Sequence, residues 1–133
     1  HYFTFDATHI SQLQRIVAFD IIANNADRKG GHCLLDEDDR IWCIDHGLTF
    51  HPTYKLRTVI WDFEGDSIPA DILNDLRKLC TTLEDKTNPL RDELCDLLRH
   101  GEIVAMQGRL NKLIQTGKYP LPGPGPNRPW PAV

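Results

Sequence analysis

The sequence lacks the features of a membrane-spanning, zinc-binding or disulfide-stabilised protein. No uninterrupted apolar run approaches the roughly 18 residues that a transmembrane helix needs. The four cysteines include no C-x-x-C pair, which disfavours a zinc cluster or a disulfide framework and favours reduced, buried thiols. The chain does not open on a basic segment followed by an apolar core, so no secretory signal is predicted. We therefore expect a cytoplasmic protein without a membrane span.

The chain also lacks an excess of basic residues. Its 15 Lys and Arg residues are outnumbered by 19 Asp and Glu residues, and the net charge is -4. A protein that binds many nucleic-acid phosphates needs a broad positive surface. The composition therefore predicts no nucleic-acid partner, and any site for an anion must be local.

Methionine is almost absent, and the only one is Met106, so His1 does not read as a translation start. We expect further sequence upstream. The 133 residues suffice for one domain with a real core, yet they are few for an enzyme with two lobes.

Apolar periodicity predicts an α+β fold that is mostly helical. Apolar residues recur at three- and four-residue steps, as on one side of a helix, in residues 9–24, 69–81, 89–100 and 102–116. Pro69 and Pro89 lie where proline favours a helix start, and Gly101 and Gly117 where glycine favours a stop.

Two short apolar runs, residues 33–35 and 41–44, flank an acidic turn and predict a β-hairpin. Residues 48–67 show no clear pattern beyond a short strand or helix at 58–63. Prolines crowd the end of the chain, so we expect a body of residues 1–117 followed by an extended Pro-rich tail, residues 118–133.

Chemistry-bearing residues gather around the predicted hairpin. A loop with the sequence Asp27-Arg28-Lys29-Gly30-Gly31-His32 precedes it, and Asp45-His46-Gly47 follows it. Phosphoryl transfer needs a carboxylate for the nucleophile, a cation for the phosphate and a second carboxylate for magnesium. Because a hairpin brings its two ends together, we expect Asp27 and Asp45 to lie within reach of one metal or phosphate.

These motifs resemble the C-terminal catalytic half of atypical kinases of the phosphatidylinositol 3/4-kinase-like type. Kinases have an Asp-x-x-x-x-Asn catalytic loop and, after a short hairpin, an Asp-Phe-Gly metal motif. Asp27 matches the first aspartate and Asp45 the second, with Gly47 in its expected place. The chain is also similar to uncharacterised actinobacterial proteins related to these kinases, over about residues 16–61.

The resemblance implies a kinase-like C-lobe whose hairpin carries the metal motif, with the N-terminal nucleotide-binding lobe outside this chain. It implies ATP and Mg or Mn as cofactors, and a nucleotide and a phosphate acceptor as partners. The implied roles are catalytic for Asp27 and Lys29, cofactor-binding for Arg28, Gly30 and Gly31, and metal-binding for Asp45 and His32.

The chain departs from the kinase pattern at two positions. His32 stands where kinases have a metal-binding asparagine, and imidazole suits manganese or zinc better than magnesium. His46 replaces the phenylalanine of Asp-Phe-Gly. No glycine-rich loop or strand lysine precedes Asp27 in these residues.

Three functions remain open at this stage. The first is transfer of the ATP γ-phosphate to a hydroxyl of a protein or small molecule; a lipid headgroup is disfavoured because Lys55 and Arg57 are the only cations in the segment just after Gly47. The second is a catalytically inactive, pseudokinase-type binding module. The third is a metal-dependent hydrolase that uses His32, Asp45 and His46. We also expect the face left by the missing lobe to be apolar and to favour self-association.

Overall fold

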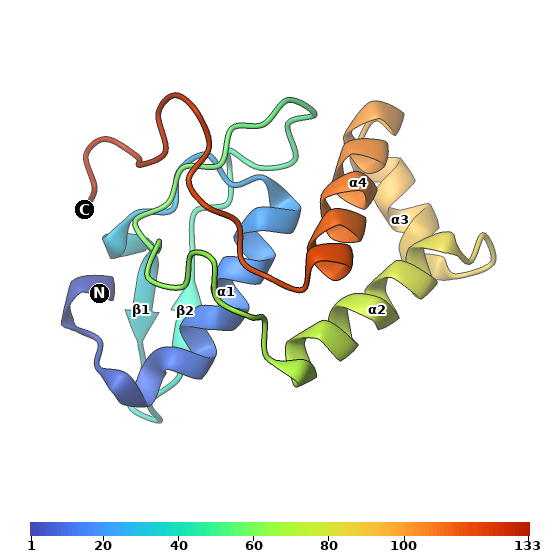
Figure 1. Cartoon of the computed structure of the whole chain (residues 1–133). Coiled ribbons are helices and arrows are strands. Elements are labelled where there is room, and N and C mark those ends of the chain that lie inside the picture. Colours follow the sequence, from blue (N-terminus) through green and yellow to red (C-terminus); the bar gives the residue numbers. More distant parts are fainter.

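The computed structural model describes residues 1–133 as a helical fold with one small hairpin (Figure 1). This confirms the predicted α+β class. In chain order the elements are the 3-10 turns η1 (Tyr2–Thr4) and η2 (Ala7–His9), α1 (Ile10–Ala23), η3 (Gly30–His32), β1 (Cys33–Leu35), β2 (Ile41–Cys43), α2 (Ala70–Glu84), α3 (Pro89–Leu97) and α4 (His100–Thr116).

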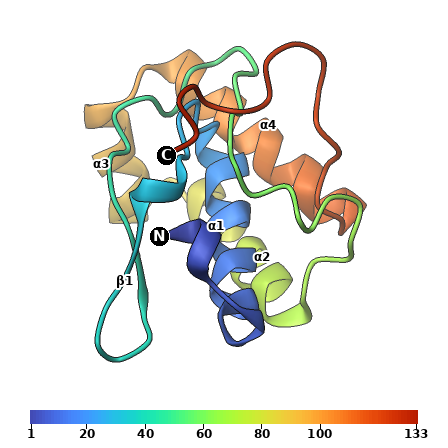
Figure 2. The ribbon, with the colours of Figure 1, turned by 90° about the vertical axis from the view of Figure 1, so that its left-hand side faces the viewer.

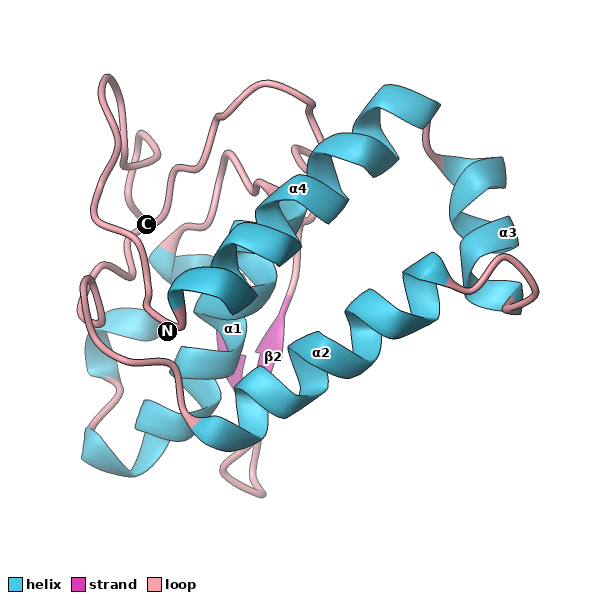
Figure 3. Ribbon diagram, turned by 45° about the vertical axis from the view of Figure 1, so that its right-hand side comes forward, coloured by secondary structure: helices cyan, strands magenta, loops and turns pink.

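Helix α1 lies in the middle of the molecule, between the hairpin and the three later helices (Figures 1 and 3). Helices α2 and α4 pack side by side, and α3 joins them at the end far from the hairpin (Figure 3). Helix α4 also packs on α1. The later helices therefore support α1 on the side opposite the hairpin.

The helix signals in the sequence are mostly correct. Asn24 ends α1 and Gly117 ends α4, both in the left-handed conformation that asparagine and glycine tolerate. Pro89 occupies the first turn of α3 after an Asn88 cap. The expected stop at Gly101 is wrong, because that glycine lies in the first turn of α4 and α3 ends earlier, at Leu97.

The hairpin is present at the predicted residues, with two faces of different character. Its register pairs Cys33 with Cys43 and Leu34 with Trp42. Because side chains alternate along a strand, Cys33 and Cys43 face α1, whereas Leu34 and Trp42 face outward. We call the exposed side chains of Leu34, Trp42 and Ile44 the outer face of the hairpin.

Helix α1 holds the far end of the hairpin through one side chain. The Gln12 amide donates to the Asp39 carbonyl oxygen at 2.8 Å, and its oxygen accepts from the Ile41 backbone at 2.8 Å. A two-stranded hairpin alone is only marginally stable in water. The glutamine thus fixes the position of this hairpin on the helix.

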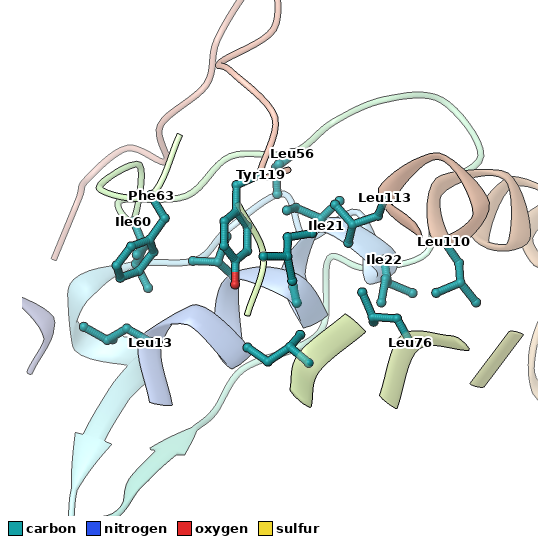
Figure 4. Close-up of a cluster of buried hydrophobic side chains, with 14 of the residues drawn as sticks. Leu13, Ile21, Ile22, Leu56, Ile60, Phe63, Leu76, Leu110, Leu113 and Tyr119 are labelled. Atoms are coloured by element: carbon teal, nitrogen blue, oxygen red, sulfur yellow. The ribbon is translucent and has the colours of Figure 1, made fainter. Parts of the chain in front are cut away.

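Residues 48–67 contain no regular helix or strand, so the expected short element at 58–63 is absent. The segment is nevertheless part of the core. Leu56, Val59 and Ile60 are buried, and Arg28 and Thr58 form an isolated parallel bridge. Figure 4 shows Leu56 near Ile21 of α1, and Ile60 beside Phe63.

The Pro-rich tail has no helix or strand, but it packs on the body of the protein. The Asn127 carbonyl oxygen accepts from the Thr58 backbone at 3.1 Å and from Trp61 Nε1 at 3.0 Å. Near the end of the tail, the Gly30 backbone donates to Ala132. Both termini consequently lie near the start of the hairpin (Figure 2).

None of the helices combines the length and the apolar character that a membrane span requires. All four cysteines are free, although they are not uniformly buried as the sequence predicts: Cys33 is buried, Cys43 and Cys80 are half-buried, and Cys95 is exposed.

Tyr119 links the tail to α1 and yields a test of the fold. Its hydroxyl donates to the Gln14 carbonyl oxygen at 3.0 Å, and burial raises its pKa to about 12. We expect Tyr119→Phe to lower the free energy of unfolding by about 1 kcal/mol at pH 8, the usual net value of one hydrogen bond. Urea titration measures this difference.

The same variant should show a distinct dependence on pH. The tyrosine ionises near pH 10 in the unfolded chain but only near pH 12 in the folded protein. Its contribution is therefore complete below pH 10 and is lost as the pH rises toward 12. The difference between wild type and Tyr119→Phe should shrink from pH 8 to pH 11. A constant difference would mean that the hydroxyl is exposed to solvent.

Candidate functional site

A buried ion pair holds the loop of residues 27–32, which precedes the hairpin. Arg28 Nε and Nη2 donate to the two carboxylate oxygens of Asp20, each at 2.9 Å. The two side chains are 0% and 1% exposed. Burial opposes the charge on Arg28, but the hydrogen bonds and charge of Asp20 outweigh this effect and raise the pKa of Arg28. Arg28 therefore stays charged inside the protein.

The same arginine connects the loop to the base of the hairpin. Arg28 Nη1 lies 3.5 Å from the His32 carbonyl oxygen and 3.4 Å from that of Ile44. These carbonyls belong to opposite arms of the hairpin, and the Ile44 backbone donates back to His32 at 3.0 Å. Arg28 thus holds the backbone at the start and at the end of the hairpin, next to the side chains of the site.

Asn25 completes this buried network. Its amide nitrogen donates to Asp20 at 3.0 Å, and its amide oxygen accepts from the Asp27 backbone at 3.0 Å. Because Asn25 is fully buried, these bonds are shielded from water and gain strength. The sequence motif does not point to Asp20, which lies in the helix before it.

Asp27, His32 and Asp45 converge at the end of the network, and we call them the site triad. Each offers one potential ligand atom, and these atoms lie within 4.8 Å of one another. His32 Nε2 is 3.4 Å from an Asp45 carboxylate oxygen. The expectation that Asp27 and Asp45 lie within reach of one shared metal therefore agrees with the geometry.

The His32 ring is oriented for a ligand by its other nitrogen. Nδ1 lies 2.8 Å from the Asp27 carbonyl oxygen. A carbonyl only accepts, so Nδ1 is the donor in this contact, and in this neutral tautomer the ring lone pair is on Nε2, the nitrogen that faces Asp45. Metal-binding histidines are commonly oriented by such a backbone contact.

Asp45 adopts an unusual backbone conformation, with φ at 60°. Only a few per cent of non-glycine residues have positive φ, and aspartate is among those that adopt it more readily. Asp45 follows the end of β2 by two residues, and its carboxylate is 62% exposed beside His32. The strained position is at the site triad, where local strain often coincides with function.

Lys29 lies beside the triad. Its ammonium nitrogen is 3.8 Å from an Asp27 carboxylate oxygen, and both side chains are partly exposed. A partly exposed ion pair contributes little stability, so the lysine is free to turn to an anionic ligand. This placement is compatible with the phosphate contact expected for it.

Of the three residues expected to contact the cofactor, Arg28 and Gly30 are covered by other parts of the protein. Arg28 is buried in the network described above. Gly30 is covered by the N-terminal segment, because a Cβ there would come within 2.6 Å of the Phe3 ring. Gly31 is less crowded, with only the backbone of Val133 within 4 Å of such a Cβ. The glycines thus permit close packing of the two termini on the loop.

His46 does not belong to the group of side chains close enough to share a metal. Its Nε2 lies 2.9 Å from Arg28 Nη2. Partial burial and the charge of Arg28 lower the pKa of His46, which keeps the ring neutral so that Nε2 accepts from the arginine. In the structure, Asp27 takes the place that the hydrolase hypothesis gives to His46.

Breaking the buried ion pair should cost much more stability than breaking an exposed ion pair of α1. Asp20→Ala should lower the free energy of unfolding by about 3–5 kcal/mol, because it leaves the Arg28 charge buried and unpaired. The control is Arg15→Ala, which removes exposed pairs with Asp71 and Asp75 and should cost less than about 1 kcal/mol. Urea titration measures both.

A double variant separates the charge from the packing. Asp20→Leu combined with Arg28→Met should regain part of the loss of Asp20→Ala, since no unpaired charge stays buried. Equal losses in Asp20→Ala and Arg15→Ala would contradict the buried, water-free environment of the pair.

Comparison with known proteins gives one relative of unstated activity. The chain is 39% identical over 123 residues to Protein Rv2133c of Mycobacterium tuberculosis, an alignment that covers 91% of this chain and 42% of the relative. The chain thus spans less than half the length of that protein. No family model matches the chain, and no solved structure matches it.

Proposed function

We propose that this chain is the C-terminal catalytic part of an ATP-dependent phosphotransferase that transfers the γ-phosphate to a hydroxyl group of a protein or small molecule. The observation that carries the proposal is the site triad, which brings two carboxylates and one oriented imidazole within 4.8 Å of one another. Lys29 adds a positive charge at the same place. Together these groups meet the chemical needs of phosphoryl transfer.

The donor set fits a small divalent cation. Asp45 and His32 would hold it, and carboxylate oxygen with imidazole nitrogen suits manganese well and magnesium less well. When bound, such a cation neutralises phosphate charge. Asp27 orients the acceptor hydroxyl and accepts its proton, while Lys29 binds the transferring phosphate through its ammonium group.

The outer face of the hairpin offers a surface for the nucleotide base. Leu34, Trp42 and Ile44 are 45%, 55% and 44% exposed, and Ile44 directly precedes Asp45 of the site triad. Exposed apolar groups next to a polar site are typical of ligand or protein contact surfaces. We place the nucleotide base against this face. The second lobe that a kinase requires would then cover the base.

The segment after Gly47 is positioned to bind the acceptor. Asn24 holds it through three bonds, donating to the His51 and Thr53 carbonyl oxygens and accepting from the Lys55 backbone. Lys55 is exposed there. A single exposed lysine is a sparse set of charges for a polyphosphorylated lipid, which favours a protein or small-molecule acceptor.

A binding module without turnover would use the same residues, so activity must be tested directly. In the intact protein, Asp27→Asn should leave metal-dependent ATP binding nearly unchanged and reduce transfer by about a hundredfold or more, the usual scale of general-base assistance. Asp45→Asn should weaken ATP binding and transfer together, because it removes a metal ligand. Calorimetry and transfer from labelled ATP measure the two effects.

The control is Asp38→Asn, which makes the same change in the exposed turn at the far end of the hairpin and should alter neither property. Wild-type transfer in Asp27→Asn would rule out a kinase at this site. ATP binding without transfer by the wild type would identify a pseudokinase. Tight binding of a transition metal with no nucleotide dependence would favour the hydrolase hypothesis.

The unusual histidine gives an independent test. His32→Asn restores the residue that kinases use, and an amide oxygen is a harder ligand than imidazole. The variant should therefore bind Mg²⁺–ATP more tightly relative to Mn²⁺–ATP than the wild type does. Calorimetry with each metal measures the ratio, and an unchanged ratio would mean that His32 does not bind the metal.

A further inference from the structure

A second cavity lies away from the site triad, between α1, α4 and the start of the tail. Its volume is about 550 Å³, within the range of small-molecule sites. One face of α4 forms a wall, with Arg109, Lys112, Leu113 and Thr116 at helical spacing. None of Asp27, Lys29, His32 or Asp45 borders it.

The remaining walls are largely apolar. Figure 4 shows Ile21, Leu56, Leu113 and Tyr119 gathered at this end of the core. Leu121, which is 66% exposed, lies at the tail side of the cavity. A ligand with an aliphatic or aromatic body would gain free energy by covering these groups.

The charged residues around the cavity all have one sign. Arg109, Lys112 and Lys118 border it, no Asp or Glu does, and none of the three cations takes part in an ion pair. This concentration of positive charge contrasts with the net charge of -4 of the chain. Like charges that share a partly enclosed space repel one another, and a bound anion would relieve the repulsion.

Arg109 has donor capacity that the protein does not use. Its Nε donates to the Ile22 carbonyl oxygen at 2.9 Å and its Nη1 to that of His51 at 3.3 Å, whereas Nη2 is buried without an acceptor. Burial also lowers the pKa of Arg109, as expected where no carboxylate is near. A buried donor without an acceptor is unfavourable.

The other large cavities lack this combination. The cavity between α1 and β2 is bordered by Arg15, but that guanidinium already pairs with Asp71. The cavity beside the N-terminal turns is bordered by three acids, Asp6, Asp62 and Asp66, and by no basic residue. Only the α4 cavity joins apolar walls to uncompensated positive charge.

We propose that the α4 cavity binds a small amphipathic oxyanion, a carboxylate or phosphate monoester on an apolar body. The apolar body lies against Leu56, Leu113 and Leu121. The oxyanion accepts from Arg109 and lies near Lys112 and Lys118. The proposal is independent of phosphotransferase activity, because the two sites share none of their charged groups.

Four probes test the proposal by calorimetry on the intact protein without metal or nucleotide. Decanoate and decyl phosphate carry both features, decanol carries only the apolar body, and inorganic phosphate carries only the charge. We expect at least one amphipathic anion to bind about tenfold or more tightly than decanol or inorganic phosphate. The tighter of the two identifies the head group as carboxylate or phosphate.

Variants locate the binding at this cavity. The double variant Lys112→Gln/Lys118→Gln should lower the affinity for the anion by about fivefold or more, as expected for two exposed charges. Its affinity for decanol should not change. Leu121→Ser should lower the affinity for both the anion and decanol. Lys86→Gln, in the exposed turn between α2 and α3, is the matched control and should change neither.

Three results would overturn the proposal. The first is no binding of either anion at millimolar concentration. The second is decanol affinity equal to that of the anions. The third is an equal effect of Lys86→Gln and the double lysine variant. These outcomes are distinct from a failure of ATP binding, which concerns Asp45 and His32 and leaves the α4 cavity intact.

Discussion

The pairing of Asp20 with Arg28 is the interaction on which the site depends. It joins the last turn of α1 to the loop that follows, and Arg28 then reaches carbonyl oxygens on both arms of the hairpin. A buried ion pair adds little net stability compared with an apolar pair, because both ions lose their hydration. Its effect here is positional: it specifies one path for the loop, and Asp27 and His32 lie at defined places along that path.

Helix α1 therefore positions the hairpin at both ends. Gln12 binds the turn, and Asp20 holds the base through Arg28. Side chains supported by a helix and by a second layer of hydrogen bonds keep their geometry better than side chains on a free loop. This support explains how a fold with two three-residue strands can hold carboxylates from separate segments close together.

Local sequence patterns predict the helices and strands, but they do not predict contacts between residues far apart in the sequence. Helical periodicity located α1 to α4, and two apolar runs located the hairpin, because these signals depend on residues near one another in sequence. The hairpin also made the approach of Asp27 to Asp45 predictable. The burial of Arg28 was not, since a loop arginine beside an aspartate is usually solvated and its partner Asp20 precedes it by eight residues. The packing of Gly30 on Phe3 likewise depends on where the termini lie.

The site triad and the α4 cavity have no charged residue in common, yet one backbone carbonyl connects them. The His51 carbonyl oxygen accepts from Asn24, which ends α1, and from Arg109, which borders the cavity. His51 lies six residues after Asp45, in the segment to which we assign acceptor binding. An anion at Nη2 that draws the Arg109 guanidinium toward the cavity lengthens the contact from Nη1 to this carbonyl. The bond from Asn24, at 2.8 Å, is shorter than the 3.3 Å contact from Arg109, so the segment keeps its attachment to α1 when the weaker contact is lost.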